Sequence, residues 1–277
     1  MSFPRTERKL PDLASKEEEL VAILEELDSC VVAFSGGLDS SYLSYMADKH
    51  VMGRVLCVTV KDPTTPCRDC DMAVNTAAKQ GLEHMILEGE LLDKVAENPY
   101  ERCYLCKTNI FQKLEGIRRK EGLEVILDGE NSSDANDVRP GRKAAQENGV
   151  LSPLRDAGLT KEEICILSEK SGLEEPYRAA SACLASRFSH GTAFNNDLLS
   201  RVDKTEEMLR RRGISMVRAR YENGGVRIEI GEDDMTPENI AILINCRDEI
   251  VNMGWSWAAL DLEGYVLAGK RLERDGR

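Results

Sequence analysis

The sequence of 277 residues predicts an α/β fold, in which a parallel-sheet domain is followed by a smaller α+β domain. Short apolar runs alternate with helical patterns through the first half, which is typical of βαβ units. The first of these runs ends in a Gly-Gly pair, and a helix begins directly after it. After about residue 190 the pattern changes to a helix, two short strands and a second helix. We therefore place the first domain at residues 1–188 and the second at residues 189–277.

The elements of the first domain follow from its apolar periodicity. The first helix is expected to open at Ser15, where Ser-x-x-Glu has the spacing of a capping box. Ligands bind parallel sheets at the carboxyl ends of the strands, so the loops after the strands are the candidate site. Strands are predicted at 31–34, 54–60, 84–87 and 124–128, and further helices at 39–49, 71–80 and 105–119.

The second domain is predicted from a different pattern. A helix at 196–212 precedes two short strands at 216–221 and 226–230. The Asn-Gly-Gly sequence at 223–225 is a strong hairpin signal between them. A helix at 237–253 and a strand at 257–262 complete this domain.

The net charge of −12 argues against a protein that binds nucleic-acid phosphates, because such proteins usually carry a basic surface. We expect a small-molecule substrate. The first residues contain no apolar signal segment, and no run reaches the roughly 18 apolar residues of a membrane helix, so we expect a cytoplasmic protein without a membrane span. Nine cysteines in a reducing compartment favour metal or catalytic thiols over disulfides.

The Ser-Gly-Gly turn after the first strand carries the clearest functional signal. Gly36 and Gly37 allow a tight turn that brings backbone N–H groups against a phosphate. Ser35 and Ser40 add hydroxyl donors, and the helix that starts at Asp39 supplies a partial positive charge. The turn lacks the Gly-Lys-Ser/Thr of a Walker A loop and the G-x-G-x-x-G of a dinucleotide site. A strand–helix turn without a ligand is the alternative.

Two C-x-x-C pairs form the second candidate site. Cys103 and Cys106 are expected directly before a helix, whose N-terminus favours thiolate ligands, and with Cys183 they could bind one metal centre. A structural zinc site that joins the first pair to Cys67 and Cys70 is the alternative. The remaining cysteines lie in apolar patterns and are expected to be packing residues: Cys30, Cys57, Cys165 and Cys246.

A polar segment follows the fourth predicted strand. Asp128 and Gly129 would lie at the carboxyl edge of the sheet, where they would face a bound nucleotide. Asp128 or Asp137 could help to hold Mg²⁺, and Arg139 could contact a phosphate. A solvated loop is the alternative.

Two arginines alternate along a predicted strand of the second domain. Arg218 and Arg220 share one face of that strand, and their guanidinium groups repel unless an anion lies between them. A phosphate or carboxylate of the substrate would serve this purpose. Salt bridges to Glu222 or Glu229 are the alternative.

Taken together, these segments resemble the LarE-type ATP-dependent sulfurtransferases, which belong to the PP-loop ATP pyrophosphatase superfamily. The resemblance extends from about Glu18 to Lys270. It rests on the order and spacing of SGGLDS (35–40), RCYLCK (102–107), LDGENSSDANDVRPG (127–141), SPL (152–154), ACLASRF (182–188), VRARY (217–221) and LDLEGY (260–265).

The resemblance implies a first domain like that of the adenine nucleotide α-hydrolases, and a step in nickel-pincer nucleotide synthesis. Each carboxylate of pyridinium-3,5-biscarboxylic acid mononucleotide would attack the α-phosphate of ATP and release pyrophosphate. A sulfur nucleophile would then displace AMP to give a thiocarboxylate. The resemblance further implies ATP and Mg²⁺, a sulfide or other sulfur donor, a homo-oligomer, and binding of the substrate phosphate by Arg218 and Arg220.

The sulfur source divides this family into two branches. In one branch a single cysteine, matching Cys183, gives up its own sulfur. In the other, three cysteines that match Cys103, Cys106 and Cys183 hold a [4Fe-4S] cluster, which carries an extra sulfide on its open iron. The chain has all three, so the resemblance implies the cluster branch and assigns catalytic roles to these cysteines and to Asp39. Cys67 and Cys70 are not part of the family pattern.

Three other functions fit parts of the sequence. A PP-loop enzyme that thiolates tRNA is disfavoured by the acidic charge and the lack of a tRNA-binding segment. An amidating PP-loop enzyme would not need the cysteines. A non-enzymatic metal-binding or nucleotide-sensing module would bind metal without releasing pyrophosphate.

Overall fold

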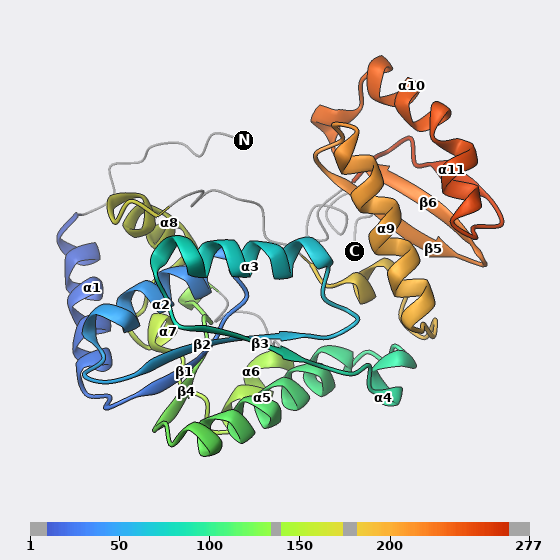
Figure 1. Cartoon of the computed structure of the whole chain (residues 1–277). Coiled ribbons are helices and arrows are strands. Elements are labelled where there is room, and N and C mark those ends of the chain that lie inside the picture. The colour runs from blue at the N-terminus through green and yellow to red at the C-terminus, as the bar shows by residue number, and fades with distance from the viewer. Residues whose placement is uncertain (1–9, 134–139, 174–181, 266–277) are drawn as a thin grey trace. The chain divides into compact units, whose positions relative to one another are not determined.

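The computed structural model describes residues 10–133, 140–173 and 182–265, which form two compact units (Figure 1). The described part of the first unit comprises residues 10–62, 69–89, 101–133 and 140–173. The second comprises 63–68, 90–100 and 182–265, so it takes in two short segments from the first half of the chain. The domain boundary expected after residue 188 stays a prediction. Among the described residues, no helix has both the length and the apolar composition needed to cross a membrane.

The first unit is built on a four-stranded parallel sheet, which confirms the predicted α/β class. Its strands are β1 (Cys30–Ala33), β2 (Val55–Lys61), β3 (His84–Glu88) and β4 (Val125–Leu127), in the order β3-β2-β1-β4. Val31 lies between Leu56 and Ile126 in the paired register, so the central strand has an apolar neighbour on each side. Because strands of a parallel sheet are covered on both faces, they read as continuous apolar runs, which is why the sequence predicts them well.

Helices cover both faces of this sheet (Figure 1). On one face, α1 (Leu10–Glu25) and α2 (Leu38–His50) supply Leu20, Leu24 and Leu43 to an apolar core. On the other face, α5 (Arg102–Glu121) and α6 (Pro140–Glu147) pack Phe111, Leu114, Ala144 and Ala145 against Val31, Leu56 and Val58. The remaining helices of the first half are α3 (Cys67–Gln80), α4 (Asp93–Ala96), α7 (Pro153–Asp156) and α8 (Lys161–Lys170).

Several helix boundaries differ from the prediction. The first helix begins at Leu10 and runs through Ser15, so the expected capping box is not used there. Helix α5 begins at Arg102, and therefore Cys103 and Cys106 lie within its first two turns rather than before it. Helix α3 begins at Cys67, four positions before the predicted start at residue 71. Its first N–H group, that of Cys67, donates to the carboxylate of Asp203, which lies 136 residues further along the chain. A cap from so far away leaves no local sequence signal.

The second unit has a three-stranded sheet with α9 (Asn196–Arg211) packed on β5. β5 (Val217–Glu222) and β6 (Gly225–Ile230) form the predicted hairpin, in which Asn223 and Gly224 both have positive φ. β7 (Ala258–Leu260) pairs with β6 in parallel. The predicted helix at 237–253 is divided at Cys246 into α10 (Pro237–Asn245) and α11 (Arg247–Asn252). This unit also contains two short 3₁₀ turns: η2 (Leu184–Arg187) lies before α9, and η3 (Glu232–Asp234) lies before α10.

Asn98 joins the segment 90–100 to the rest of the second unit. Its side chain is fully buried, and its amide donates to the backbone oxygens of Ser189 and Thr192 at 2.8 and 3.1 Å. The Gly191 N–H donates in turn to the Asn98 carbonyl at 2.9 Å. The buried amide of Asn98 therefore holds the segment 90–100 against the segment that precedes α9.

Gly36 is needed at the turn after β1 on two independent grounds. Its φ of +68° lies in the left-handed region, and a Cβ there would come within 2.6 Å of the Ala73 Cα on α3. The backbone of α3 therefore lies directly against this turn, closer than any side chain would permit.

We predict that Gly36→Ala destabilises the protein more than Gly81→Ala does. Gly81 has a φ of +69° but open space around it, so alanine there costs only the left-handed conformation, about 1–2 kcal/mol. At Gly36 the clash with α3 adds to that cost. Urea unfolding of both variants measures the difference, and equal losses would contradict the close approach of α3.

Candidate active site

The PP-loop, defined here as residues 35–40, is closed by its two serines. The Ser40 hydroxyl accepts a hydrogen bond from the Ser35 N–H at 3.2 Å and donates to the Gly37 carbonyl at 3.1 Å. The two hydroxyl oxygens of Ser35 and Ser40 lie 3.0 Å apart, and the Gly37 N–H donates to the Ser35 hydroxyl. These contacts hold the loop in one shape before any ligand binds.

The loop leads directly into the N-terminus of α2. Gly37 is the N-cap residue, and it offers no side chain that could occupy the first N–H groups of the 13-residue helix. Those N–H groups have no partner within a helix, and the helix dipole adds a partial positive charge at the same point. The structure therefore places the N-terminus of a helix at the carboxyl end of β1, where the sequence predicts it, and binding of a phosphate there stays a prediction.

The loop after β4 meets the same helix end. A Cβ on Gly129 would lie 3.0 Å from the Ser40 nitrogen, which is tighter than most real Cβ contacts, so glycine favours this close approach of the two backbones. The buried Asn131 amide donates to Asp39 Oδ1 at 3.1 Å, which orients that carboxylate. The PP-loop and the segment 128–131 thus form one polar edge of the sheet, as expected for Asp128 and Gly129.

Asp128 is a buried carboxylate at this edge. Its Oδ1 accepts hydrogen bonds from the Ser152 hydroxyl at 2.7 Å and from the Glu130 N–H at 3.2 Å. Burial raises the pKa of Asp128, while the Ser152 hydrogen bond and the charge of Lys107 oppose that rise. Both hydrogen bonds reach Oδ1, and none of those formed by the described residues reaches Oδ2.

Cys103 and Cys106 are one helical turn apart at the start of α5. Cys103 is exposed, and Cys106 is partly exposed with its thiol 3.9 Å from the Asp62 carboxylate at the end of β2. Cys183 is also exposed, but it belongs to the other unit, so its placement with the pair stays a prediction. Within the part of the chain that the structure describes, no group of three or more Cys, His, Asp or Glu side chains is arranged to hold a metal ion.

The other cysteines divide as follows. Cys30, Cys57 and Cys246 are buried, as expected for packing residues, whereas Cys165 on α8 is only partly buried. Cys70 is buried in α3, while Cys67 at the start of that helix is exposed. Asp137 and Arg139 lie outside the described residues, so their expected contacts with Mg²⁺ and phosphate stay predictions.

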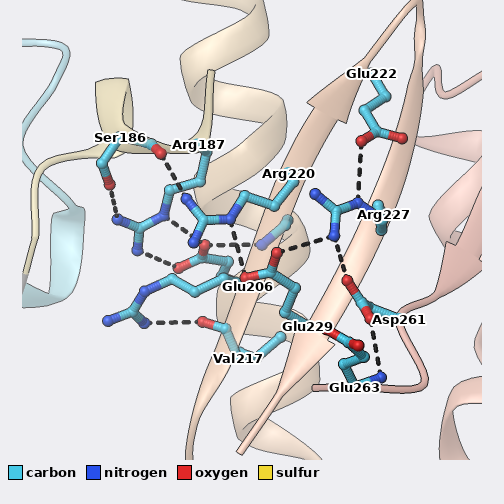
Figure 2. Close-up of polar contacts among 12 residues, drawn as sticks. Ser186, Arg187, Glu206, Val217, Arg220, Glu222, Arg227, Glu229, Asp261 and Glu263 are labelled. Atoms are coloured by element: carbon cyan, nitrogen blue, oxygen red, sulfur yellow. Dashed lines mark hydrogen bonds and ion pairs between the residues drawn. The ribbon is translucent and has the colours of Figure 1, made fainter. Parts of the chain in front are cut away.

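A buried ion pair organises the second unit. Arg187 on η2 and Glu206 on α9 are each 1% exposed and form two parallel hydrogen bonds of 2.8 and 2.9 Å (Figure 2). Burial alone would raise the pKa of Glu206, but the nearby charges of Arg187 and Arg210 outweigh it and hold this pKa below the usual value. Glu206 also accepts a hydrogen bond from the Ala219 N–H on β5 at 3.0 Å. One carboxylate therefore ties η2, α9 and β5 together.

Arg218 and Arg220 have different surroundings. Arg220 donates to Glu229 at 3.0 Å and to the Ser186 carbonyl at 2.6 Å, and Arg227 pairs with the same Glu229 (Figure 2). Arg218 donates to the Val217 carbonyl at 2.9 Å and lies 5.0 Å from the centre of the Tyr265 ring. Burial lowers the pKa of Arg218, as does the charge of Arg187. No carboxylate among the described residues forms an ion pair with Arg218.

Sequence reasoning missed three side chains that shape these sites. Ser152, Asn131 and Glu206 all make short contacts with partners far along the chain. Ser152 and Asn131 lie inside segments that the family resemblance covers, which was the one available signal. Glu206 lies in a charged helix where its burial could not be foreseen.

Known proteins are similar to this chain in sequence. The family model described as asparagine synthase matches residues 24–134, which span the PP-loop and β4. A pyridinium-3,5-bisthiocarboxylic acid mononucleotide synthase of Lactiplantibacillus plantarum is 32% identical over 260 residues, or 91% of this chain and 92% of that protein. The chain belongs to the LarE-type ATP-dependent sulfurtransferases.

Two uncharacterized proteins are also similar to this LarE-type chain over most of its length. One, from Synechocystis sp., is 33% identical over 91% of this chain and 96% of its own. The other, from Methanocaldococcus jannaschii, is 30% identical over 85% of this chain and 90% of its own. Such coverage extends the similarity across both units, well beyond the PP-loop.

We predict that Glu206→Gln destabilises this LarE-type enzyme by about 3–5 kcal/mol at pH 7, because Arg187 is then left buried without its charge partner. Glu207→Gln is the matched control: its pair with Arg211 is exposed, so the expected loss is at most about 1 kcal/mol. Urea unfolding checks both values.

The pH dependence of stability gives the same comparison a second readout. Because folding lowers the pKa of Glu206, its contribution is present above the unfolded pKa of about 4.3 and is lost as the pH falls through the folded value. Acidification should therefore destabilise the wild type more than Glu206→Gln. Parallel acid profiles would contradict this account.

Proposed function

We propose that the enzyme converts pyridinium-3,5-biscarboxylic acid mononucleotide to its bisthiocarboxylic acid form. The observation that carries this proposal is the 32% identity, over 91% of the chain, to a protein named as the synthase of that product. The chain's PP-loop supports the use of ATP, and its motifs extend the likeness through both units.

The first chemical step is activation of a substrate carboxylate. A carboxylate is a poor electrophile, so its oxygen attacks the α-phosphorus of ATP, and pyrophosphate leaves. The first N–H groups of α2 and the Ser35 and Ser40 hydroxyls bind the departing pyrophosphate as its negative charge develops. Asp39 and Asp128 would hold Mg²⁺, since both are carboxylates at the loop that meets ATP. When bound, this ion neutralises charge on the phosphates.

The second step replaces AMP by sulfur. The acyl-adenylate carbon accepts a sulfur nucleophile, AMP leaves, and the thiocarboxylate remains. The donor set on α5 fits an iron–sulfur cluster, because the thiols of Cys103, which is exposed, and Cys106, which is partly exposed, are separated by one helical turn. Cys183, the third ligand in the family pattern, is exposed as well. When bound, such a cluster supplies an iron site that carries sulfide. The alternative source is the sulfur of Cys183 itself.

Arg218 is the arginine that we assign to the substrate phosphate. Its guanidinium is mostly buried and has no described carboxylate partner, so an incoming phosphate would compensate its charge. Arg220 already pairs with Glu229, which supports the salt-bridge alternative for this residue. Arg220 would then contact the phosphate only through guanidinium N–H groups that do not already donate to Glu229 or Ser186.

We predict that Asp39→Asn lowers the rate of substrate-dependent pyrophosphate release by about 10²-fold, because it removes one charge from the ATP site. Asp48→Asn, on the exposed side of the same helix, should leave the rate unchanged. Release is measured with and without the dicarboxylate nucleotide. Equal effects of the two variants would show that the charge of Asp39 is not used.

The sulfur source is tested by metal analysis of protein purified without oxygen. The cluster proposal predicts about four irons with at least as much acid-labile sulfide per chain, lost together in Cys103→Ser but retained in Cys246→Ser. Zinc near one per chain without iron would contradict it. Loss of sulfur from Cys183 after a single turnover would then support the alternative.

A further inference from the structure

Two exposed cysteines lie on segments that meet within the second unit. The Leu184 N–H donates to the Thr64 carbonyl at 2.8 Å, which joins the segment before α3 to the segment that carries Cys183. Cys67 lies three residues after Thr64, and Cys183 immediately precedes Leu184. Both side chains are exposed.

Helix α9 holds these two segments at neighbouring points. Asp203 Oδ2 accepts a hydrogen bond from the Cys67 N–H at 3.1 Å. Three residues later, Glu206 binds Arg187, whose Nη1 donates to the Cys183 carbonyl at 3.1 Å. Residues three apart share one face of a helix and differ by roughly 4.5 Å along its axis. The two α9 carboxylates that hold these segments, one directly and one through Arg187, are therefore separated by less than one helical turn along the axis.

We propose that Cys67 and Cys183 form a reversible thiol–disulfide pair that switches sulfur transfer off under oxidising conditions. The inference rests on the proposed function, since it gives Cys183 a second fate besides its role in sulfur delivery. Exposure of both thiols allows a low-molecular-weight disulfide such as oxidised glutathione to reach them. Cys67 is outside the family's motifs, and the proposed function does not use it.

The oxidation proceeds by two exchange steps. The Cys67 thiolate attacks one sulfur of oxidised glutathione, which forms a mixed disulfide and releases one glutathione thiolate. The Cys183 thiolate then attacks the Cys67 sulfur, closes the Cys67–Cys183 bond and releases the second glutathione. Two protein thiols are oxidised and one glutathione disulfide is reduced to two thiols. In the closed form Cys183 can neither bind iron nor supply sulfur.

Trypsin separates the relevant cysteines cleanly. Cys67 lies in peptide 62–68, Cys70 in 69–79, and Cys183 in 179–187. The full-length protein, freed of bound iron by a chelator, is equilibrated with oxidised glutathione, alkylated and digested. We expect a species that joins peptides 62–68 and 179–187 and disappears after dithiothreitol. A link from 62–68 to 69–79, or glutathione adducts alone, would overturn the proposal.

Activity supplies a second, independent readout. After reconstitution with iron and sulfide, oxidised protein should retain substrate-dependent pyrophosphate release and lose thiocarboxylate formation. Cys67→Ser should need at least about tenfold more oxidised glutathione for the same loss, because it lacks the intramolecular second step. Cys70→Ser is the matched control and should still form the link and lose sulfur transfer. If Cys67→Ser is inactivated like the wild type, the switch is wrong. If reduced wild-type protein releases no pyrophosphate, the proposed function fails, and the peptide result still stands by itself.

Discussion

The nucleotide site depends on the close packing that two glycines, Gly36 and Gly129, permit around the PP-loop. Gly36 brings the turn against the backbone of α3, and Gly129 brings the loop after β4 against Ser40. A Cβ at Gly36 would force the turn away from α3, and one at Gly129 would push the loop after β4 a few tenths of an ångström from Ser40. The loop that carries Asp128 would then shift relative to the N-terminus of α2.

In the second unit, the packing depends on a buried charged group, the carboxylate of Glu206. Glu206 accepts hydrogen bonds from Arg187, Arg210 and the Ala219 N–H, so one carboxylate satisfies donors on η2, α9 and β5. A buried carboxylate is tolerated only when such partners compensate for its lost hydration. Burial and the charge of Arg187 lower the pKa of Arg218, although the charge of Glu206 in the same network opposes this shift.

The sheet of the first unit and the PP-loop could be predicted because both leave local signals. β1 and β2 are nearly continuous apolar runs, and the glycine pair follows directly. The start of α3 could not be predicted, because its cap comes from Asp203 on a distant helix. Spacing showed that Arg218 and Arg220 share a strand face. Only tertiary packing distinguishes them: Arg220 pairs with Glu229, whereas Arg218 forms no ion pair with a carboxylate of the described residues. The burial of Glu206 could not be predicted either, because the sequence of α9 around it is rich in charged residues.

The most direct test of the central claim follows the oxygen atoms of the substrate. The dicarboxylate nucleotide is labelled with oxygen-18 in its carboxylates, converted in one turnover, and the phosphate products are examined by mass spectrometry. Attack on the α-phosphorus followed by displacement with sulfur predicts one labelled oxygen in AMP for each thiocarboxylate formed, and none in pyrophosphate. Label in inorganic phosphate together with ADP, or AMP without label, would contradict acyl-adenylation.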